Sequence, residues 1–208
     1  MITRSVLWAW VSVPSQTKVK IEVADLDDHL IIACRLPGGI TSPSALWDFL
    51  MKKRSAQGLV PESRFNKAGF YDVNGSRAGV MDSDGGYFLQ EDVRAFENSF
   101  FGINNLEAIS MDPQQRKLLE VVFECFEHAG VSLDRVSGTN TGVYVGNFTI
   151  DYQSMQSRDP DSINRYSATG TGTTILANRI SHVFNLQGPR YVSSPFPREI
   201  QALVKTVA

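Results

Sequence analysis

The stretch 112–129 constrains the fold most strongly, because it carries a complete set of helix signals. Asp112 can cap the helix, and Pro113 suits the first helical position, where a missing N–H leaves no bond unmade. Five apolar side chains then recur at helical spacing on one stripe: Leu118, Val122, Cys125, Phe126 and Ala129. Gly130 can adopt the left-handed conformation that ends a helix. The sequence therefore predicts an amphipathic helix with one face against a core.

Regular elements on either side of this helix indicate a layered domain. Residues 141–147 are apolar without strict alternation, which is typical of a strand buried on both faces. A further helix is expected at about 173–184 and is closed by Gly188-Pro189; one face carries Leu176, Ile180, Val183 and Phe184. Helices and strands thus alternate, and the predicted class is α/β with a layered sheet.

A shorter helix is expected to begin at Pro43, with Ser42 as its cap. Four side chains fall on one side of it at helical spacing: Leu46, Phe49, Leu50 and Lys53. The cations at 52–54 lie where the negative end of the helix dipole favours them. Residues 61–90 are rich in Gly, Asp, Asn and Ser, and we expect a long surface excursion with little regular structure.

Composition excludes several classes of function. The 208 residues fit one domain, and 42% apolar residues can form a substantial core. The net charge is −2 and no basic stripe is present, so nucleic acid is not an expected partner. Two cysteines give no disulfide framework, which favours a reducing, cytoplasmic location. No apolar stretch approaches the roughly 20 residues that a membrane-spanning helix needs, so no membrane partner is expected.

Residues 1–30 differ from the rest and are treated as a divergent N-terminal segment. The apolar run 5–13 follows Arg4 and loosely resembles a signal peptide, but it is short, contains two tryptophans and leads into Pro14. We therefore do not favour secretion. Residues 17–23 alternate in polarity and could form a strand, although acidic residues interrupt the pattern from Asp25 onward.

Three superficial motifs carry little weight. Gly170 and Gly172 begin a dinucleotide fingerprint, but Ile175 stands where the third glycine belongs. Asp82 and Asp84 resemble the opening of a calcium loop that no acidic residue closes at the required spacing. The glycosylation sequons at 74–76 and 147–149 mean little without secretion. No metal or directly bound cofactor is expected.

The residues alone reveal no catalytic constellation. Cys125 lies on the apolar stripe and is expected to be a buried core thiol. Cys34 stands beside Arg35, and a nearby cation could lower its pKa. A nucleophile also needs a base, and no local pattern pairs a histidine with either cysteine. The histidines are scattered at His29, His128 and His182, and His128 is expected to be a surface residue near a helix end.

Five motifs in register resemble the N-terminal half of a beta-ketoacyl synthase (ketosynthase) domain. They read ACRLPGG at 33–39, FFGI at 100–103, MDPQQR at 111–116, YSATGTG at 166–172 and ANRIS at 177–181. The resemblance is to fungal iterative highly reducing type I polyketide synthases and covers residues 31–189. It implies a partial thiolase-like fold, namely the N-terminal half of the layered αβαβα ketosynthase domain.

The resemblance also implies a reaction and partners. Ketosynthases hold an acyl chain on a cysteine and condense it with a malonyl unit that loses carbon dioxide, while two histidines assist. The malonyl unit arrives on the phosphopantetheine arm of an acyl carrier protein, and the domain pairs with a second ketosynthase protomer.

No catalytic residue can be carried over to this chain. After Gly188-Pro189 the family continues into a Thr-Ala-Cys-Ser-Ser elbow, whereas here Ser193-Ser194 has no cysteine before it and Pro195 follows. We therefore interpret residues 31–189 as an incomplete ketosynthase region, 190–208 as a divergent tail, and the chain as a truncated domain that is inactive alone. One alternative is a half-domain that dimerises with an intact ketosynthase or regulates it. Another is an enzyme using Cys34 or the serine pair, which the absent base disfavours.

Overall fold

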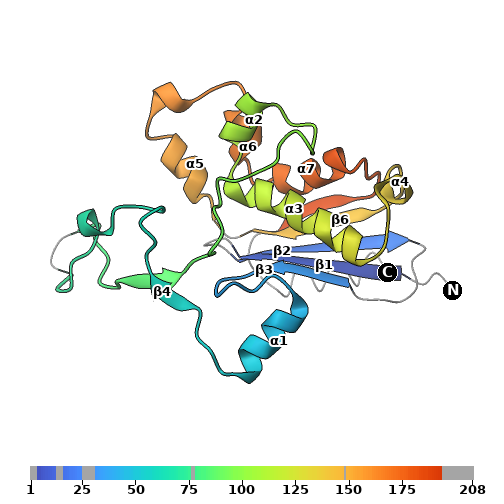
Figure 1. Ribbon diagram of the computed structural model, residues 1–208. Helices are drawn as coiled ribbons and strands as arrows, with labels where there is room; N and C mark the ends of the chain where they lie inside the picture. The colour runs from blue at the N-terminus through green and yellow to red at the C-terminus, as the bar shows by residue number, and fades with distance from the viewer. Residues whose placement is uncertain (1–3, 13–15, 25–30, 76–77, 148, 194–208) are drawn as a thin grey trace.

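The computed structural model describes residues 4–12, 16–24, 31–75, 78–147 and 149–193, and its main sheet has the strand order β3-β1-β2-β6-β7 (Figure 1). β3 runs parallel to β1 and β7 runs parallel to β6, whereas β2 is antiparallel to both of its neighbours. The strands span Arg4–Ser12 (β1), Gln16–Ala24 (β2), Ile31–Arg35 (β3), Gly142–Gly146 (β6) and Arg190–Ser193 (β7).

The hairpin of β1 and β2 forms the middle of this sheet. Ala9 pairs with Val19 inside the hairpin, Trp8 pairs with Ile32 on β3, and Ile21 pairs with Val143 on β6. The strand predicted at 17–23 is therefore confirmed, and the apolar run after Arg4 is also a strand. The sequence analysis set residues 1–30 apart on composition, which does not show that backbone hydrogen bonds join residues 4–12 and 16–24 to the sheet.

Two helices lie over one face of the sheet, α3 (Pro113–His128) and α7 (Ile175–Val183) (Figure 1). The predicted capping of α3 is confirmed, since the Asp112 carboxylate accepts a hydrogen bond from the Gln114 N–H at 2.8 Å and Gly130 has a φ of 64°. Apolar side chains of these helices and of β6 form most of the main core in the described residues, including Leu118, Leu119, Phe126, Val143 and Ile180, and Met111 and Leu186 from the adjoining turns also belong to it.

A second group of short helices lies beyond the start of α3. These helices are α2 (Asn105–Ser110), α5 (Asp151–Gln156), η2 (Pro160–Ser162) and α6 (Ser167–Thr171), whereas α4 (Leu133–Val136) follows the other end of α3 (Figure 1). An ion pair between Arg179 on α7 and Glu107 ties α2 to the main layer. The Tyr152 hydroxyl donates to the Ile109 carbonyl at 3.4 Å and joins α5 to α2. Sequence analysis missed this group because its helices are too short to show a clear period.

The remaining elements are α1 (Pro43–Met51) and the ribbon of β4 (Gln57–Leu59) and β5 (Gly85–Tyr87). The excursion expected at 61–90 is confirmed, because its regular structure amounts to β5 and the single turn η1 (Lys67–Gly69). Ser42 caps α1 as expected, but the expected side for Leu50 was wrong. Leu50 is 59% exposed, and Phe49 is the buried residue of the helix.

The layered α/β class is confirmed, with helices stacked on one face of a mixed sheet (Figure 1). Among the described residues, no helix has the length and apolar content that crossing a membrane requires.

Candidate functional site

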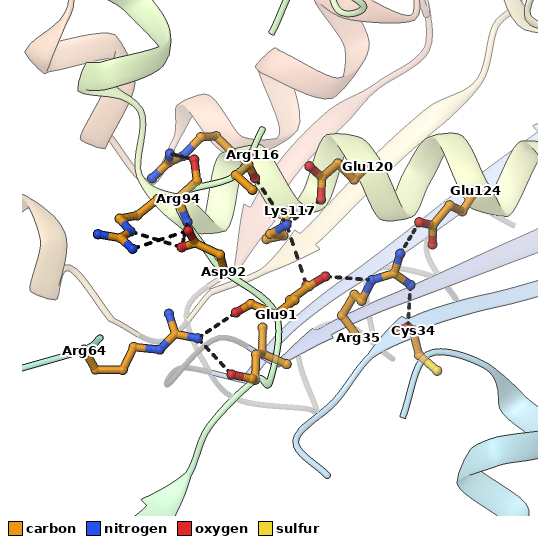
Figure 2. A network of polar contacts seen from close by, with 12 residues as sticks. Cys34, Arg35, Arg64, Glu91, Asp92, Arg94, Arg116, Lys117, Glu120 and Glu124 are labelled. Atoms are coloured by element: carbon orange, nitrogen blue, oxygen red, sulfur yellow. Dashed lines mark hydrogen bonds and ion pairs between the residues drawn. The ribbon is translucent and has the colours of Figure 1, made fainter. Parts of the chain in front are cut away.

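Cys34, the first candidate nucleophile, lies on β3 and is 2% exposed. Burial raises the pKa of its thiol; the charge of Arg35 opposes this shift and that of Glu124 adds to it. The charge of Arg35 therefore acts in the direction considered from the sequence, but burial outweighs it and the net shift is upward. The guanidinium is an ion-pair partner of Glu124 and Glu91, and these carboxylates offset its charge (Figure 2).

Cys125 lies on the inner face of α3 and is fully buried, as predicted. Burial raises the pKa of this thiol to about 12, although a hydrogen bond from the Ala33 backbone opposes the shift. A thiol must be deprotonated to act as a nucleophile. Both cysteines are therefore buried thiols with raised pKa values, which disfavours the thiolate form.

The candidate bases and serines lie at separate places in the fold. His128, at the end of α3, is exposed as predicted, and His182 is exposed on α7. Ser193 is buried at the end of β7, whereas His29 and Ser194 lie outside the described residues. No metal-binding group of three or more His, Cys, Asp or Glu side chains occurs in the described part of the chain.

A network of charged side chains joins β3, residue 91 and α3; we call it the Glu91 network (Figure 2). Glu91 pairs with Arg35 at 3.6 Å and with Lys117 at 3.7 Å. Lys117 is only 3% exposed and also pairs with Glu120 at 2.8 Å. The members are Arg35, Glu91, Lys117, Glu120 and Glu124.

The ion pairs of the Glu91 network have a structural role. Burial raises the pKa of Glu120, whereas its hydrogen bond from Lys117 lowers it. Each cation has carboxylate partners, which a buried charge requires. The network therefore holds α3 against β3 and against the loop that carries Glu91. Each of its carboxylates is paired with a cation, so none is available as a general base.

A cavity of about 540 Å³ opens beside the Glu91 network. Phe49 and several charged side chains line it, and these include Arg54, Arg64, Glu91, Asp92 and Arg94. Arg64 donates to the carbonyls of Leu89 and Glu91 at 2.8 and 3.0 Å, and Arg94 pairs with Asp92 at 3.1 Å (Figure 2). Most of the charge around the cavity is thus already satisfied by the protein itself.

The start of α3 packs tightly on α6 through polar contacts. The Asp112 N–H donates to the Gly170 carbonyl at 2.8 Å, and the Gln115 side chain donates to the Thr169 carbonyl at 3.0 Å. Asp112 and Gln115 are both buried. Two motifs, 111–116 and 166–172, are therefore joined in space although about fifty residues separate them in the sequence.

Comparison with known proteins agrees with this geometry. Residues 32–194, well over half of the chain, match the family model for the beta-ketoacyl synthase N-terminal domain. The chain belongs to the beta-ketoacyl synthase family. The contact between 111–116 and 166–172 is thus a contact between two motifs of a ketosynthase domain.

The curated relatives of this ketosynthase region are fungal synthases. The chain is 68% identical over 164 residues to the highly reducing polyketide synthase virA of Hypocrea virens and 60% identical over 160 residues to fogA of Aspergillus ruber. These alignments cover 79% and 77% of this chain. The chain spans only 7% of the length of each relative.

Solved ketosynthase structures share the fold. The oxazolomycin ketosynthase domain of Streptomyces albus superposes with a TM-score of 0.64 at 27% identity, covering 77% of this chain and 28% of that one. The ketosynthase from module 6 of the bacillaene synthase of Bacillus subtilis gives 0.62, also at 27% identity, covering 83% and 29%. The expected partial thiolase-like fold is confirmed.

Sequence reasoning missed the buried polar side chains of this ketosynthase region. It placed the apolar stripe of α3 but did not predict that Gln114, Gln115, Arg116 and Lys117 are all under 10% exposed. Arg116 reaches the Arg94 carbonyl at 3.1 Å, and Lys117 reaches Glu91. The sequence signal for this burial was the run of long polar side chains immediately after the helix cap. The groups that pair with these side chains lie in distant segments, so the run alone could not show that it is buried.

Proposed function

We propose that this chain supplies scaffold to the ketosynthase of a highly reducing polyketide synthase and does not supply the nucleophile of condensation. One observation carries the proposal. The sequence has two cysteines, Cys34 and Cys125, and burial raises the pKa of both thiols. The acyl-bearing cysteine of such a synthase would then lie outside these 208 residues.

In the proposed reaction, a malonyl thioester on the phosphopantetheine arm of an acyl carrier protein loses carbon dioxide and becomes an enolate. The enolate carbon attacks the acyl thioester, a carbon–carbon bond forms, and the cysteine leaves as a thiolate. Loading of the acyl group beforehand needs an accessible thiolate, and the condensation needs donors for the developing oxyanion. The carrier protein and a second ketosynthase protomer are the partners we propose for the whole domain.

Scaffold function in this region would rest on α3. The helix contacts β3 through the Glu91 network, α6 through Asp112 and Gln115, and α7 through the main core. Such a helix fixes the relative positions of the surrounding segments, and a catalytic group held on a rigid scaffold needs that support.

The test is a decarboxylation assay with the purified 208-residue chain and malonyl-loaded acyl carrier protein. We expect no carbon dioxide above the level released by the carrier alone, whereas an intact ketosynthase given the same carrier releases it. In parallel, both thiols should react with iodoacetamide far more slowly in buffer than in urea, because they are buried.

A matched variant makes the assay decisive. Decarboxylation by the chain that disappears in Cys34→Ala would contradict the proposal, because it would make Cys34 a working nucleophile. Rapid alkylation of Cys34 in buffer would contradict the burial on which the proposal depends.

A further inference from the structure

Helix α1 presents two apolar stripes, and the described part of the chain covers only one of them. Phe49 is buried beside the half-buried Ala45 and Leu46, which pack against Cys34 and Ile40. Trp47, Leu50 and Met51 point the other way and are 65%, 59% and 63% exposed. They stand at positions i, i+3 and i+4, so they form one continuous surface stripe on the helix.

A helix that is apolar on both sides is normally buried on both sides. α1 projects below the sheet, away from α3 and α7 (Figure 1). An exposed cluster with a tryptophan at its centre is typical of an interaction surface, because aromatic anchors dominate binding energy.

Three cations follow this stripe directly, and their backbone is held in place. Lys52, Lys53 and Arg54 are all exposed. The Lys53 N–H donates to the Leu50 carbonyl at 3.0 Å and the Arg54 N–H to the Phe49 carbonyl at 3.2 Å. Lys53 has a φ of 48°, a left-handed conformation that favours glycine at a helix end. The chain thus has a lysine where backbone strain alone would select glycine.

The charges of these lysines are unused within the described residues. Neither Lys52 nor Lys53 forms an ion pair with another described side chain, whereas Arg54 stacks over the Phe49 ring at 5.3 Å. The surface therefore combines an apolar stripe with uncompensated positive charge at one end. We call Trp47, Leu50, Met51, Lys52 and Lys53 the α1 surface.

We propose that the α1 surface binds an acidic amphipathic helix of a protein partner. The partner's apolar stripe would cover Trp47, Leu50 and Met51, and its carboxylates would pair with Lys52 and Lys53. Helices bind such surfaces through apolar anchors at i, i+3 and i+4, and complementary charge fixes their orientation. This proposal rests on the geometry of α1 and does not depend on the ketosynthase reaction.

A membrane surface fits these observations less well. The apolar stripe has three side chains on a nine-residue helix, and the exposed carboxylate of Asp48 lies next to Trp47. Interfacial helices have a broader apolar face, and anionic lipid would repel that carboxylate. A partner helix needs only a short stripe and can avoid Asp48.

The test uses the full chain and a fluorescein-labelled synthetic peptide that forms an amphipathic helix of about 16 residues, with a leucine stripe flanked by glutamates. A second peptide has lysine in place of each glutamate. Fluorescence anisotropy should show binding of the glutamate peptide, weaker binding at high salt, and no comparable binding of the lysine peptide.

Variants then assign the site. Lys52→Glu combined with Lys53→Glu should weaken binding of the glutamate peptide about tenfold or more, and Trp47→Ala should do the same through the apolar stripe. These side chains are exposed, so far-UV circular dichroism should be unchanged. A matched control, Arg158→Glu with Arg165→Glu, reverses two other exposed charges and should leave the affinity within about twofold.

Three results would overturn the proposal. The two peptides could bind equally well, which would remove the role of charge. The glutamate peptide could bind without sensitivity to either α1 variant, which would place its site elsewhere. Vesicles of phosphatidylcholine and phosphatidylserine could bind the chain while the glutamate peptide does not, which would make a lipid surface the occupant.

Discussion

Asp112 is under two opposing influences at the start of α3. Its carboxylate caps the helix through the Gln114 N–H, and the charge of Arg116 favours its ionised form. Burial nevertheless outweighs these contacts and raises the pKa from 3.8 to about 6, and the charge of Asp151 adds to the shift. The folded chain therefore keeps a proton on Asp112 at pH values where the unfolded chain has lost it.

Asp112→Asn should remove this source of pH dependence. Between about pH 4 and pH 6 the folded state binds more protons at Asp112 than the unfolded state, so rising pH lowers the free energy of unfolding. The two-unit shift corresponds to about 3 kcal/mol at neutral pH as an upper figure. Asparagine caps as well as aspartate. The variant should thus gain about 1–3 kcal/mol over the parent at pH 7.5 relative to pH 4.5, measured by urea denaturation.

Asp151→Asn is the companion variant for this measurement. Asp151 is exposed and acts on Asp112 only through its charge, so its removal should change the pH dependence much less, in the same direction. If Asp112→Asn left the pH profile of the parent unchanged, Asp112 would not be the group that titrates.

At the scale of elements, the contact between α6 and the start of α3 depends on a missing side chain. Gly170 lies in α6, and its backbone approaches the 110–112 turn closely enough for the Asp112 N–H to reach the Gly170 carbonyl. A Cβ atom at Gly170 would overlap the Ser110 carbonyl oxygen and lie 3.1 Å from the Met111 nitrogen. Glycine is therefore required here for packing.

Gly170→Ala should destabilise the chain by about 2–4 kcal/mol, because the overlap is with backbone that cannot rotate away. The loss should appear as a lower midpoint in thermal or urea denaturation. Gly58→Ala is the control, since a Cβ at Gly58 meets no atom within 4 Å. Equal midpoints for the two variants would show that α6 does not approach the 110–112 turn as described.

Elements with strong local signals could be predicted from the sequence, and long-range partners could not. The capping and bounds of α3 followed from Asp112, Pro113 and Gly130, because these signals act within one turn. The raised pKa of Cys34 did not, because burial and the carboxylates that occupy Arg35 come from distant segments. Leu50 was misplaced because α1 is apolar on both sides, and periodicity cannot tell which side faces the core.

For the whole molecule, packing is concentrated in one part. Among the residues whose burial is described, α3, β6 and α7 contribute most of the buried apolar side chains, whereas the described part of 61–84 contains a single helical turn and no strand. Backbone groups in such a segment bond mainly within local turns. Local opening needs little free energy where few buried contacts are lost.

Hydrogen exchange followed by mass spectrometry should divide the chain accordingly. We expect amides in 61–84 to exchange at least about a hundredfold faster than those of α3 and β6. A peptide from α7 provides an internal reference for the protected part. Comparable protection of 61–84 and α3 would mean that the excursion is packed more firmly than its contacts indicate.

The Glu91 network has a consequence for how α3 is aligned. Lys117, Glu120 and Glu124 occupy successive turns of one side of the helix, and they meet Glu91 and Arg35 with opposite sign. The buried apolar residues beside them are Leu118, Leu119, Val121 and Val122, which differ little in size, so apolar packing alone distinguishes other rotations of the helix only weakly. A rotation by one residue would separate Lys117 from Glu91 and Glu124 from Arg35, and breaking such part-buried pairs costs several kcal/mol, although Lys117 would keep Glu120 on its own helix. The order of positive and negative side chains along α3 therefore favours one rotation of the helix about its axis. Apolar packing alone would select that rotation less strictly.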